Sequence, residues 1–253
     1  MSPAGAQQPD AFCRSTLSPM LLVVAATERE ASPLRAALAS RHRGTVFGVA
    51  VWEGSLDLVP VRLAVCGIGR ASTAFHLARL LLDPPQAVLQ FGVGGAFADG
   101  PPIGGVALAI EDVYADLGVA GEERWLPADV LGIPLLERGD TRYYDAFPCA
   151  AEPTAAAAAA LGAPTGRFVT VETVTGTAAR ADELALRHRP IAESMEGAAA
   201  AHACALDDVP FVQLRAMSNL VGPRDRSAWR MDEAVQTAVD AVCSVASTVL
   251  EVT

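Results

Sequence analysis

The chain contains 253 residues, 51% of them hydrophobic, and carries a formal net charge of −10. This length and hydrophobic content are enough for one large α/β domain with a substantial core. The acidic balance argues against a general nucleic-acid binder, which needs a basic surface to replace the counterions of the phosphate backbone, but it leaves a small nucleoside possible as a ligand.

Cysteine usage and hydropathy indicate a cytoplasmic protein without a membrane segment. The five cysteines lie far apart with no CxxC pair, which is typical of reduced thiols: Cys13, Cys66, Cys149, Cys204 and Cys243. The Ala-rich run 155–161 is too short to span a bilayer. Residues 1–19 lack the basic start and apolar segment of a signal peptide, so we expect a disordered leader there and a single domain over 20–253.

The first half of the chain alternates strands with helices. The apolar run 20–26 predicts a strand buried on both faces, and Thr27 with Glu30 fits a capping box that opens a helix. The turn Gly67-Ile68-Gly69 separates a strand from a further helix. The remaining elements expected here are strands over 46–54, 58–66 and 87–91 and a helix over 71–82.

The second half continues the alternation, with a weaker pattern over 115–161 that we interpret as loops and a short helix. The expected elements are strands over 106–113, 167–171 and 210–216 and helices over 194–205 and 227–250, the last with Ser227 as N-cap. Strands and helices that alternate throughout predict an α/β fold, a three-layer α/β/α sandwich around a central mixed, largely buried sheet.

The stretch from Ser194 to Asn219 is the first candidate for a functional site. Glu196 opens a small-residue helix, and Asn219 follows a strand at the edge where ligands of open α/β sheets gather. A carboxylate for hydroxyl groups and an amide for a heterocycle together suggest a nucleoside. Arg215, at the end of the same apolar strand, is costly to bury unpaired, so we expect it to meet an acid.

Other candidates leave two interpretations open. Glu30 serves either the cap and dipole of its helix or, if it faces the same pocket as Glu196, as a base toward water. The glycines at 92, 94 and 95 form either a tight turn with positive φ or a backbone wall for a ring or a sugar. No metal site is expected, because the histidines show no ligand spacing: His42, His76, His188 and His202.

Several motifs together resemble the nucleoside phosphorylase and nucleosidase superfamily. They extend from residue 20 to the last helix and are TEREASPL, GIGRAS, FGVGGAF, IGGVALAIEDVYADLG, SMEGAAAAHAC and VPFVQLRAMSN. Within it, AATERE, TVETVTGTA and SNLVGPRDRSAW are most similar to the futalosine hydrolase family, and methylthioadenosine/S-adenosylhomocysteine nucleosidases share the scaffold. The resemblance implies a phosphorylase/hydrolase-like fold, a purine nucleoside as small-molecule substrate, no cofactor, and a homo-oligomer of two or more subunits.

The resemblance also implies roles by position. Glu30 matches the glutamate that holds and activates the attacking water. Met195 and Glu196 match the pair that lines the ribose, with Glu196 on its 2′- and 3′-hydroxyls. Thr173 and Val174 fall in the segment that lies along the purine.

Further positions follow the pattern less closely. Gly94 belongs to the glycine wall expected to bind substrate, and Arg215 matches an arginine that orients neighbouring acids. The family often has Glu-Met-Glu, whereas here Ser194 precedes the methionine and the extra acid is Glu193. A ribose contact from position 194 is therefore in doubt.

Asn219 falls where the adenine-specific nucleosidases carry an aspartate that protonates N7. Hypoxanthine presents two acceptors, O6 and N7, which the NH₂ group of an asparagine matches, whereas adenine presents a 6-amino donor beside N7. A mismatch at a buried polar group discriminates by up to roughly 10⁴–10⁵-fold. Asn219 therefore favours a 6-oxopurine leaving group. Together with it, the resemblance implies hydrolysis of futalosine to hypoxanthine and dehypoxanthine futalosine, a step of menaquinone biosynthesis by the futalosine route.

Three alternatives stay open. Phosphorolysis of inosine or guanosine fits Asn219 equally well and would place phosphate near Arg70, but Glu30 would repel it. A methylthioadenosine/S-adenosylhomocysteine nucleosidase ranks lower because of Asn219. A nucleoside-binding protein without turnover ranks lowest, because both candidate carboxylates are present. The cationic candidates for the 5′ substituent are Arg224 and Arg226.

Overall fold

The computed structural model describes residues 20–122 and 124–253, except for the side chains of residues 40–42. The leader expected over 1–19 and the thiol of Cys13 lie outside the described residues, as does the side chain of His42. In the described part of the chain, no helix is both long and apolar enough to cross a membrane.

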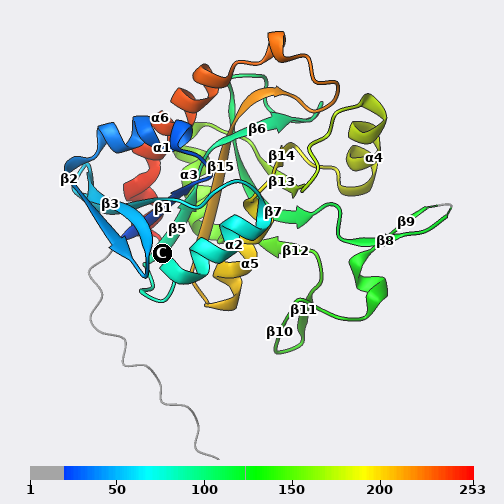
Figure 1. Ribbon diagram of the computed structural model, residues 1–253, viewed down its shortest axis with the longest axis horizontal. Helices are drawn as coiled ribbons and strands as arrows, with labels where there is room; N and C mark the ends of the chain where they lie inside the picture. The colour runs from blue at the N-terminus through cyan, green and yellow to red at the C-terminus, as the bar shows by residue number, and fades with distance from the viewer. Residues whose placement is uncertain (1–19, 123) are drawn as a thin grey trace, which may run out of the picture.

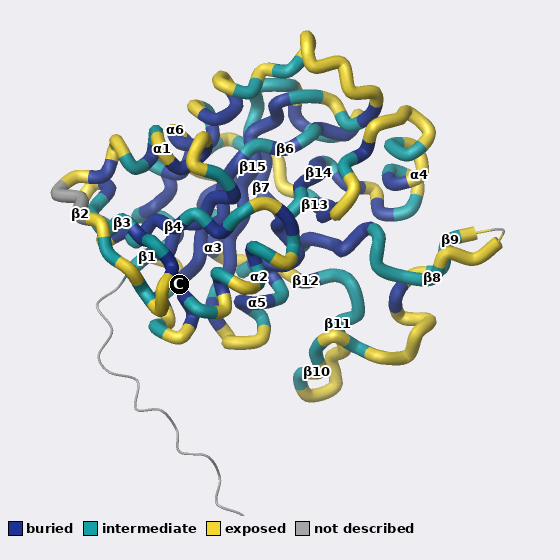
Figure 2. The backbone as a smooth tube through the Cα atoms, viewed as in Figure 1, coloured by how far each residue is buried: buried dark blue, intermediate teal, exposed yellow. Residues whose placement is uncertain are grey.

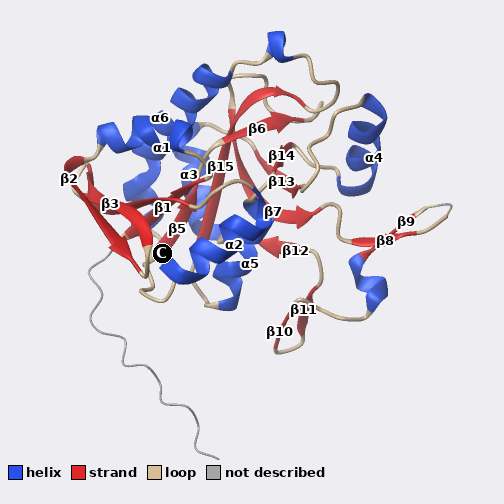
Figure 3. Ribbon diagram, in the orientation of Figure 1, coloured by secondary structure: helices blue, strands red, loops and turns tan. Residues whose placement is uncertain are grey.

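Within the described residues, helices cover both faces of an 11-stranded sheet (Figures 1 and 3). The strands of this sheet are β1 (Leu21–Ala25), β2 (Ala39–Val46), β3 (Val49–Leu56), β4 (Val59–Val65), β5 (Ala87–Gln90), β6 (Val93–Ala96), β7 (Val106–Tyr114), β12 (Ala146–Pro148), β13 (Thr165–Thr170), β14 (Ala192–Ser194) and β15 (Phe211–Leu220). The helices are α1 (Glu28–Ala37), α2 (Gly69–Leu80), α3 (Ala151–Leu161), α4 (Ala178–His188), α5 (Gly197–Leu206) and α6 (Met231–Glu251), with short 3₁₀ turns η1 (Ala128–Leu131) and η2 (Arg226–Ala228).

The sheet is mixed, which confirms the predicted fold class. Its strand order is β12-β7-β13-β14-β6-β15-β5-β1-β4-β3-β2. The pairing is parallel from β6 through β15, β5 and β1 to β4, and antiparallel between β14 and β6 and among β4, β3 and β2 at one edge. At the other end β15 also pairs with β7, so that β15, β6, β14, β13 and β7 form a closed ring. This closure brings the ends of β6, β14 and β15 together.

Alternate residues of the central strands fill the two cores on either side of the sheet. In β1, Leu22 and Val24 join the cluster that contains α2 and α5, while Leu21, Val23 and Ala25 join the cluster that contains α1, α3 and α6. All five side chains are at most 1% exposed, which confirms the predicted strand buried on both faces (Figure 2).

The hairpin at the sheet edge differs from the prediction. The strand expected over 46–54 is interrupted at Phe47 and Gly48, whose φ values of 47° and 82° make a tight turn between β2 and β3. Positive φ at a phenylalanine is uncommon, so residue type does not indicate a turn at this position. Without that turn, the strand β2 before it cannot be predicted.

The region 115–161 contains more strands than we expected. Besides β12 and α3 it forms two small hairpins, β8–β9 (Gly118–Ala120 and Trp125–Pro127) and β10–β11 (Leu136–Arg138 and Thr141–Tyr143). These hairpins extend away from the body of the molecule (Figure 1). Strands of three residues are too short to show a period-2 pattern, so the sequence does not predict these two hairpins.

The start of the last helix was also misplaced. Ser227 is not its N-cap, because Asp225 Oδ1 accepts hydrogen bonds from the amide and hydroxyl of Ser227 and closes the separate turn η2. The helix begins at Met231 instead, after Arg230. Helix α4, over 178–188, was not predicted.

Candidate active site

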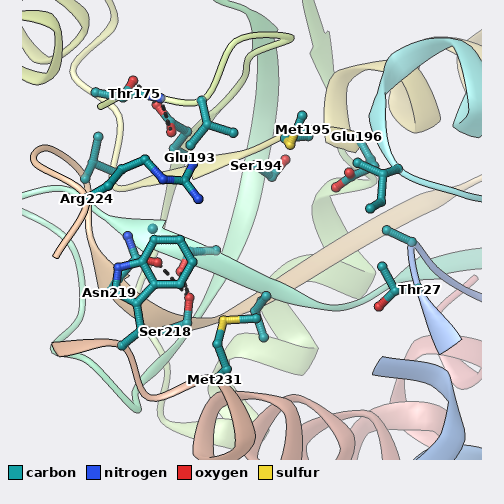
Figure 4. A pocket seen from close by; sticks show the side chains of 18 of the residues that line it. Thr27, Thr175, Glu193, Ser194, Met195, Glu196, Ser218, Asn219, Arg224 and Met231 are labelled. Carbon is teal, nitrogen blue, oxygen red and sulfur yellow. Dashed lines mark hydrogen bonds between the residues drawn. The ribbon is translucent and has the colours of Figure 1, made fainter. Parts of the chain in front are cut away.

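A cavity of about 400 Å³ opens where the ends of β1, β6, β14 and β15 meet the starts of α1, α5 and α6 (Figure 4). Six of the predicted site residues line it: Glu30, Gly94, Val174, Met195, Glu196 and Asn219. Thr173 is exposed and is not part of the wall, where Thr175 stands beside Val174 instead. Arg215 is 1% exposed and lies behind the wall rather than in it.

Glu30 acts both as a helix cap and as a wall of the cavity. Thr27, the N-cap of α1, and Glu30 form the predicted capping box, in which Glu30 Oε2 accepts from the amide of Thr27 at 3.0 Å and from its hydroxyl at 2.7 Å. The other oxygen, Oε1, accepts from the amide of Val93 at 3.0 Å. A carboxylate has about four acceptor sites, so these three bonds leave one for a ligand or a water.

Glu196 reaches the cavity from the N-cap position of α5, where its side chain makes no capping hydrogen bond. Its Oε1 accepts from the amide of Gly69 at 3.1 Å, and its Oε2 lies 3.4 Å from Nη2 of Arg215. Arg215 thus meets the acid that we expected. Each carboxylate oxygen of Glu196 keeps acceptor capacity, which suits two adjacent hydroxyl groups.

Arg215 also lies close to Glu30. A Cβ atom at position 92 would be 2.5 Å from Glu30 Oε1 and 2.7 Å from Arg215 Nη1, so only glycine lets all three approach. The guanidinium group is therefore placed near both carboxylates, which offsets the cost of burying it.

Asn219 stands at the far end of the cavity from Glu196 in Figure 4. It is the penultimate residue of β15, not a residue beyond the strand, because β15 continues to Leu220. Its Oδ1 accepts from the hydroxyl of Ser218 at 2.8 Å, and its Nδ2 donates to the carbonyl oxygen of Leu220 at 2.8 Å. The carbonyl oxygen of Leu220 only accepts, so it fixes which way the amide faces, and one N–H of the amide remains for a ligand.

The glycine segment is not the tight turn that one interpretation required. Gly94 and Gly95 belong to strand β6, and neither they nor Gly92 has positive φ. There is little room for a side chain at either position. A Cβ at 94 would be 3.1 Å from the carbonyl oxygen of Glu193, and one at 95 would be 2.8 Å from Val221. Gly94 and Gly95 line the cavity as bare backbone.

Sequence reasoning gave Glu193 no role of its own. Its carboxylate lies in the cavity wall and accepts hydrogen bonds from the amide and hydroxyl of Thr175 (Figure 4). Burial raises the pKa of Glu193 above its ordinary value, against the lowering effect of those bonds. The available signal was its place two residues before Met195, since alternate residues of an extended segment share a face. The neighbouring Ser194 instead accepts a hydrogen bond from the amide of Gly197 at 3.3 Å.

The arginines considered for substrate or phosphate binding differ in their partners and in their distance from the cavity. Arg70 does not line the cavity and makes ion pairs of 2.7 Å with both Asp116 and Glu172. Arg224 does line it, with its guanidinium carbon 5.0 Å from the centre of the Trp229 ring. Arg226 borders a separate outer groove that shares Trp229 with the cavity. In the part of the chain that is described, no three His, Cys, Asp or Glu side chains converge to hold a metal ion.

Comparison with known proteins assigns the chain to a family. The family model described as the phosphorylase superfamily matches residues 21–251. The chain belongs to the phosphorylase superfamily. Futalosine hydrolase from Streptomyces coelicolor is 42% identical over 73% of this chain and 77% of its own, and futalosine hydrolase from Thermus thermophilus is 37% identical over 79% and 86%.

A solved structure gives the same fold at lower sequence identity. The 5′-methylthioadenosine/S-adenosylhomocysteine nucleosidase from Neisseria meningitidis, in complex with methylthio-immucillin-A, superimposes with a TM-score of 0.78 at 20% identity over 90% of this chain and 99% of its own. This structure confirms the predicted fold, while the family model and the two relatives confirm the sequence resemblance to the superfamily and, within it, to the futalosine hydrolases.

Proposed function

We propose that the protein hydrolyses the N-glycosidic bond of futalosine and releases hypoxanthine and dehypoxanthine futalosine. The observation that carries the proposal is the placement of two carboxylates, Glu30 and Glu196, in the wall of one cavity that also presents the amide of Asn219. The similarity to futalosine hydrolases at 37% and 42% identity supports the choice of substrate.

The two carboxylates act on different reactants, Glu30 on the water and Glu196 on the ribose. Glu30 uses its remaining acceptor site to take a proton from the attacking water, while its capping-box bonds keep the group in place. Glu196 accepts hydrogen bonds from the ribose hydroxyls and holds the sugar in position as its anomeric carbon gains positive charge. The oxygen of the water ends on that carbon, and hypoxanthine leaves with its bonding electron pair as an anion. Glu30 then releases the proton of the water to the solvent, and hypoxanthine takes up one proton from the solvent, so that one water is consumed in all.

Asn219 serves the leaving group. Its free N–H donates to N7 or O6 of hypoxanthine and stabilises the negative charge that grows on the base. Because Nδ2 also donates to the carbonyl oxygen of Leu220, the amide nitrogen and not its oxygen faces the remaining space, where its one free N–H suits an acceptor atom of the base.

The arginine arrangement favours water over phosphate as the acceptor. Arg70, the sequence candidate for a phosphate site, is occupied by Asp116 and Glu172 and lies outside the cavity wall. The position of the nucleophile is next to Glu30, whose charge repels phosphate. Arg224, stacked against Trp229 at the cavity wall, is the better placed of the two cationic candidates for the 5′ substituent.

Incubation of the protein with futalosine, inosine and methylthioadenosine, each with and without phosphate, tests the proposal. We expect free hypoxanthine from futalosine at a rate that does not depend on phosphate. Phosphate-dependent formation of ribose 1-phosphate from inosine would overturn it. We further propose a homo-oligomeric assembly, which sedimentation of the purified protein checks, and a cytoplasmic location, which fractionation of cells checks.

A further inference from the structure

The start of helix α5 is held in part by residues outside the cavity. Glu196 occupies the N-cap position, but its carboxylate is turned into the cavity and caps no amide of α5, whose first amide donates to Ser194. The first amides of a helix have no partner within the helix and need one from elsewhere. The amide of Ala198 donates to Thr170 Oγ1 at 2.8 Å, and Thr170 comes from β13.

Thr170 is in turn held by a carboxylate. Its hydroxyl donates to Asp112 Oδ1, on β7, at 2.8 Å, so that a relay runs from Asp112 through Thr170 to the amide of Ala198. All three residues are 0% exposed. A carboxylate beneath a helix N-terminus also interacts favourably with the helix dipole.

The residue after Glu196 packs tightly onto this relay. A Cβ at Gly197 would lie 2.0 Å from Asp112 Oδ2 and 2.3 Å from Nε2 of Gln213. Only glycine allows the backbone of α5 to approach these side chains so closely, and the close approach leaves the first turn little freedom to shift. The position of Glu196 therefore depends on the groups beneath it.

The same cluster borders the arginine that pairs with Glu196. Gln213 and Arg215 stand two residues apart on β15, so their side chains lie on the same face of the strand. Burial raises the pKa of Asp112 to about 7, and the positive charge of Arg215 acts in the opposite direction. The side chain of Gln213 lies beside Asp112 and, like Arg215, acts to lower its pKa. The amide of Gln213 can present either its oxygen or its nitrogen to Asp112, as the protonation of the acid requires.

We propose that Asp112 and Thr170 are positioning residues for the reaction, which fix the first turn of α5 and thereby aim the carboxylate of Glu196 into the cavity. The proposal rests on the proposed function insofar as Glu196 binds the ribose. Neither residue touches the cavity, so each acts only through Glu196.

Thr170→Val, compared with Thr154→Val, tests the proposal. Thr154, on α3, is a buried threonine whose hydroxyl has no partner among the described residues, so it is a matched control. We expect Thr170→Val to lower kcat/KM for futalosine about 10- to 100-fold, since misplacement of a binding group by 1 Å costs up to about 10²-fold. Thr154→Val should leave kcat/KM within about twofold. Thr170→Ser, which keeps the hydroxyl, should restore most of the loss, and Thr170→Ala repeats the test if the valine variant does not fold.

A double variant separates positioning from a general structural effect. In a Glu196→Gln background, Thr170→Val should lower kcat/KM by less than about twofold, because no carboxylate remains to be aimed. An equal loss in both backgrounds, or equal kinetics for Thr170→Val and Thr154→Val, overturns the proposal.

Crystal structures of the Thr170 variants give a readout that does not need turnover. We expect Glu196 Oε1 to leave the amide of Gly69 in Thr170→Val but not in Thr170→Ser. An unmoved Glu196 in Thr170→Val overturns the positioning role even if the wild-type protein does not hydrolyse futalosine, whereas absence of futalosine hydrolysis by the wild type overturns the proposed function alone.

Discussion

Glu30 and Glu196 face the same cavity but are anchored in different ways. Glu30 is held mainly by Thr27, three residues earlier, within the first turn of its own helix. Glu196 is held by Gly69 of α2 and Arg215 of β15, while Thr170 of β13 anchors the start of its helix. One carboxylate depends on a local motif and the other on contacts between distant segments.

The two carboxylates should therefore respond differently to loss of their charge. A glutamine at position 30 can keep the capping box through its oxygen, so the helix survives, although its NH₂ group then faces the amide of Val93. Loss of the charge at position 196 removes the partner of a buried guanidinium group. Activity and stability should therefore separate at Glu30 and fall together at Glu196.

The largest effect is expected from Glu30→Gln. Removal of the general base should lower kcat about 10²- to 10⁴-fold, while the midpoint of thermal unfolding should fall less than in Glu196→Gln, because the capping box is kept. Steady-state kinetics and calorimetry measure the two effects. Activity within about threefold of the wild type would remove Glu30 from the reaction.

Glu196→Gln should lower kcat/KM about 10- to 100-fold, the equivalent of the ~1.5–3 kcal/mol that a hydrogen bond to a charged group contributes. It should also lower the free energy of unfolding by about 3 kcal/mol, because Arg215 is left without this partner in a buried site. Chemical denaturation of both variants checks the contrast. If Glu30→Gln proves the more destabilising of the two, the comparison fails.

The support beneath Glu196 should give stability a pH dependence. Burial raises the pKa of Asp112 from its ordinary 3.8 to about 7, so between these values the folded state binds more protons than the unfolded state. Stability from this group is complete below about pH 4 and is lost as pH rises toward 7, by at most about 1.4 kcal/mol per pH unit.

Asp112→Asn removes the titrating group and with it this pH dependence. The difference in the free energy of unfolding, wild type minus variant, should therefore decrease from about pH 4.5 to about pH 7. His188, whose pKa burial lowers to about 4, contributes a slope of opposite sign that is present in both proteins and cancels. Denaturant titrations at a series of pH values measure the difference. A difference independent of pH would contradict the account.

The smallest effect concerns the local anchor. Thr27→Ala should lower the free energy of unfolding by about 1 kcal/mol, the usual cost of losing an N-cap, and should also lower kcat because Glu30 loses a hydrogen-bond donor. Thr177→Ala, at the N-cap of α4, removes an equivalent cap that does not line the cavity. Equal kcat values for the two variants would show that the capping box does not orient Glu30.

The sequence predicts the local features of the site and misses the distant ones. Thr27 and Glu30 stand three residues apart, so their spacing shows the capping box directly. The buried strand β1 is likewise evident from its apolar run. The relay from Asp112 to Thr170 and Ala198 joins β7, β13 and α5, and no local pattern reveals it.

Where the cavity wall departs from the prediction, the reason is also geometric. Thr173 is exposed and Thr175 lines the wall, a shift that depends on the course of a loop without periodic pattern. The ring formed by β6, β7, β13, β14 and β15 depends on a pairing between β7 and β15, which are about 100 residues apart in the chain. The catalytic and binding roles of the site residues stay predictions.

The most direct test of the central claim is futalosine turnover in H₂¹⁸O, with mass spectrometry of the sugar product. If water is the acceptor, we expect one ¹⁸O atom at the anomeric carbon of dehypoxanthine futalosine, free hypoxanthine, and no dependence on phosphate. A phosphorylated sugar product that forms only when phosphate is present, without ¹⁸O from water at that carbon, would contradict it.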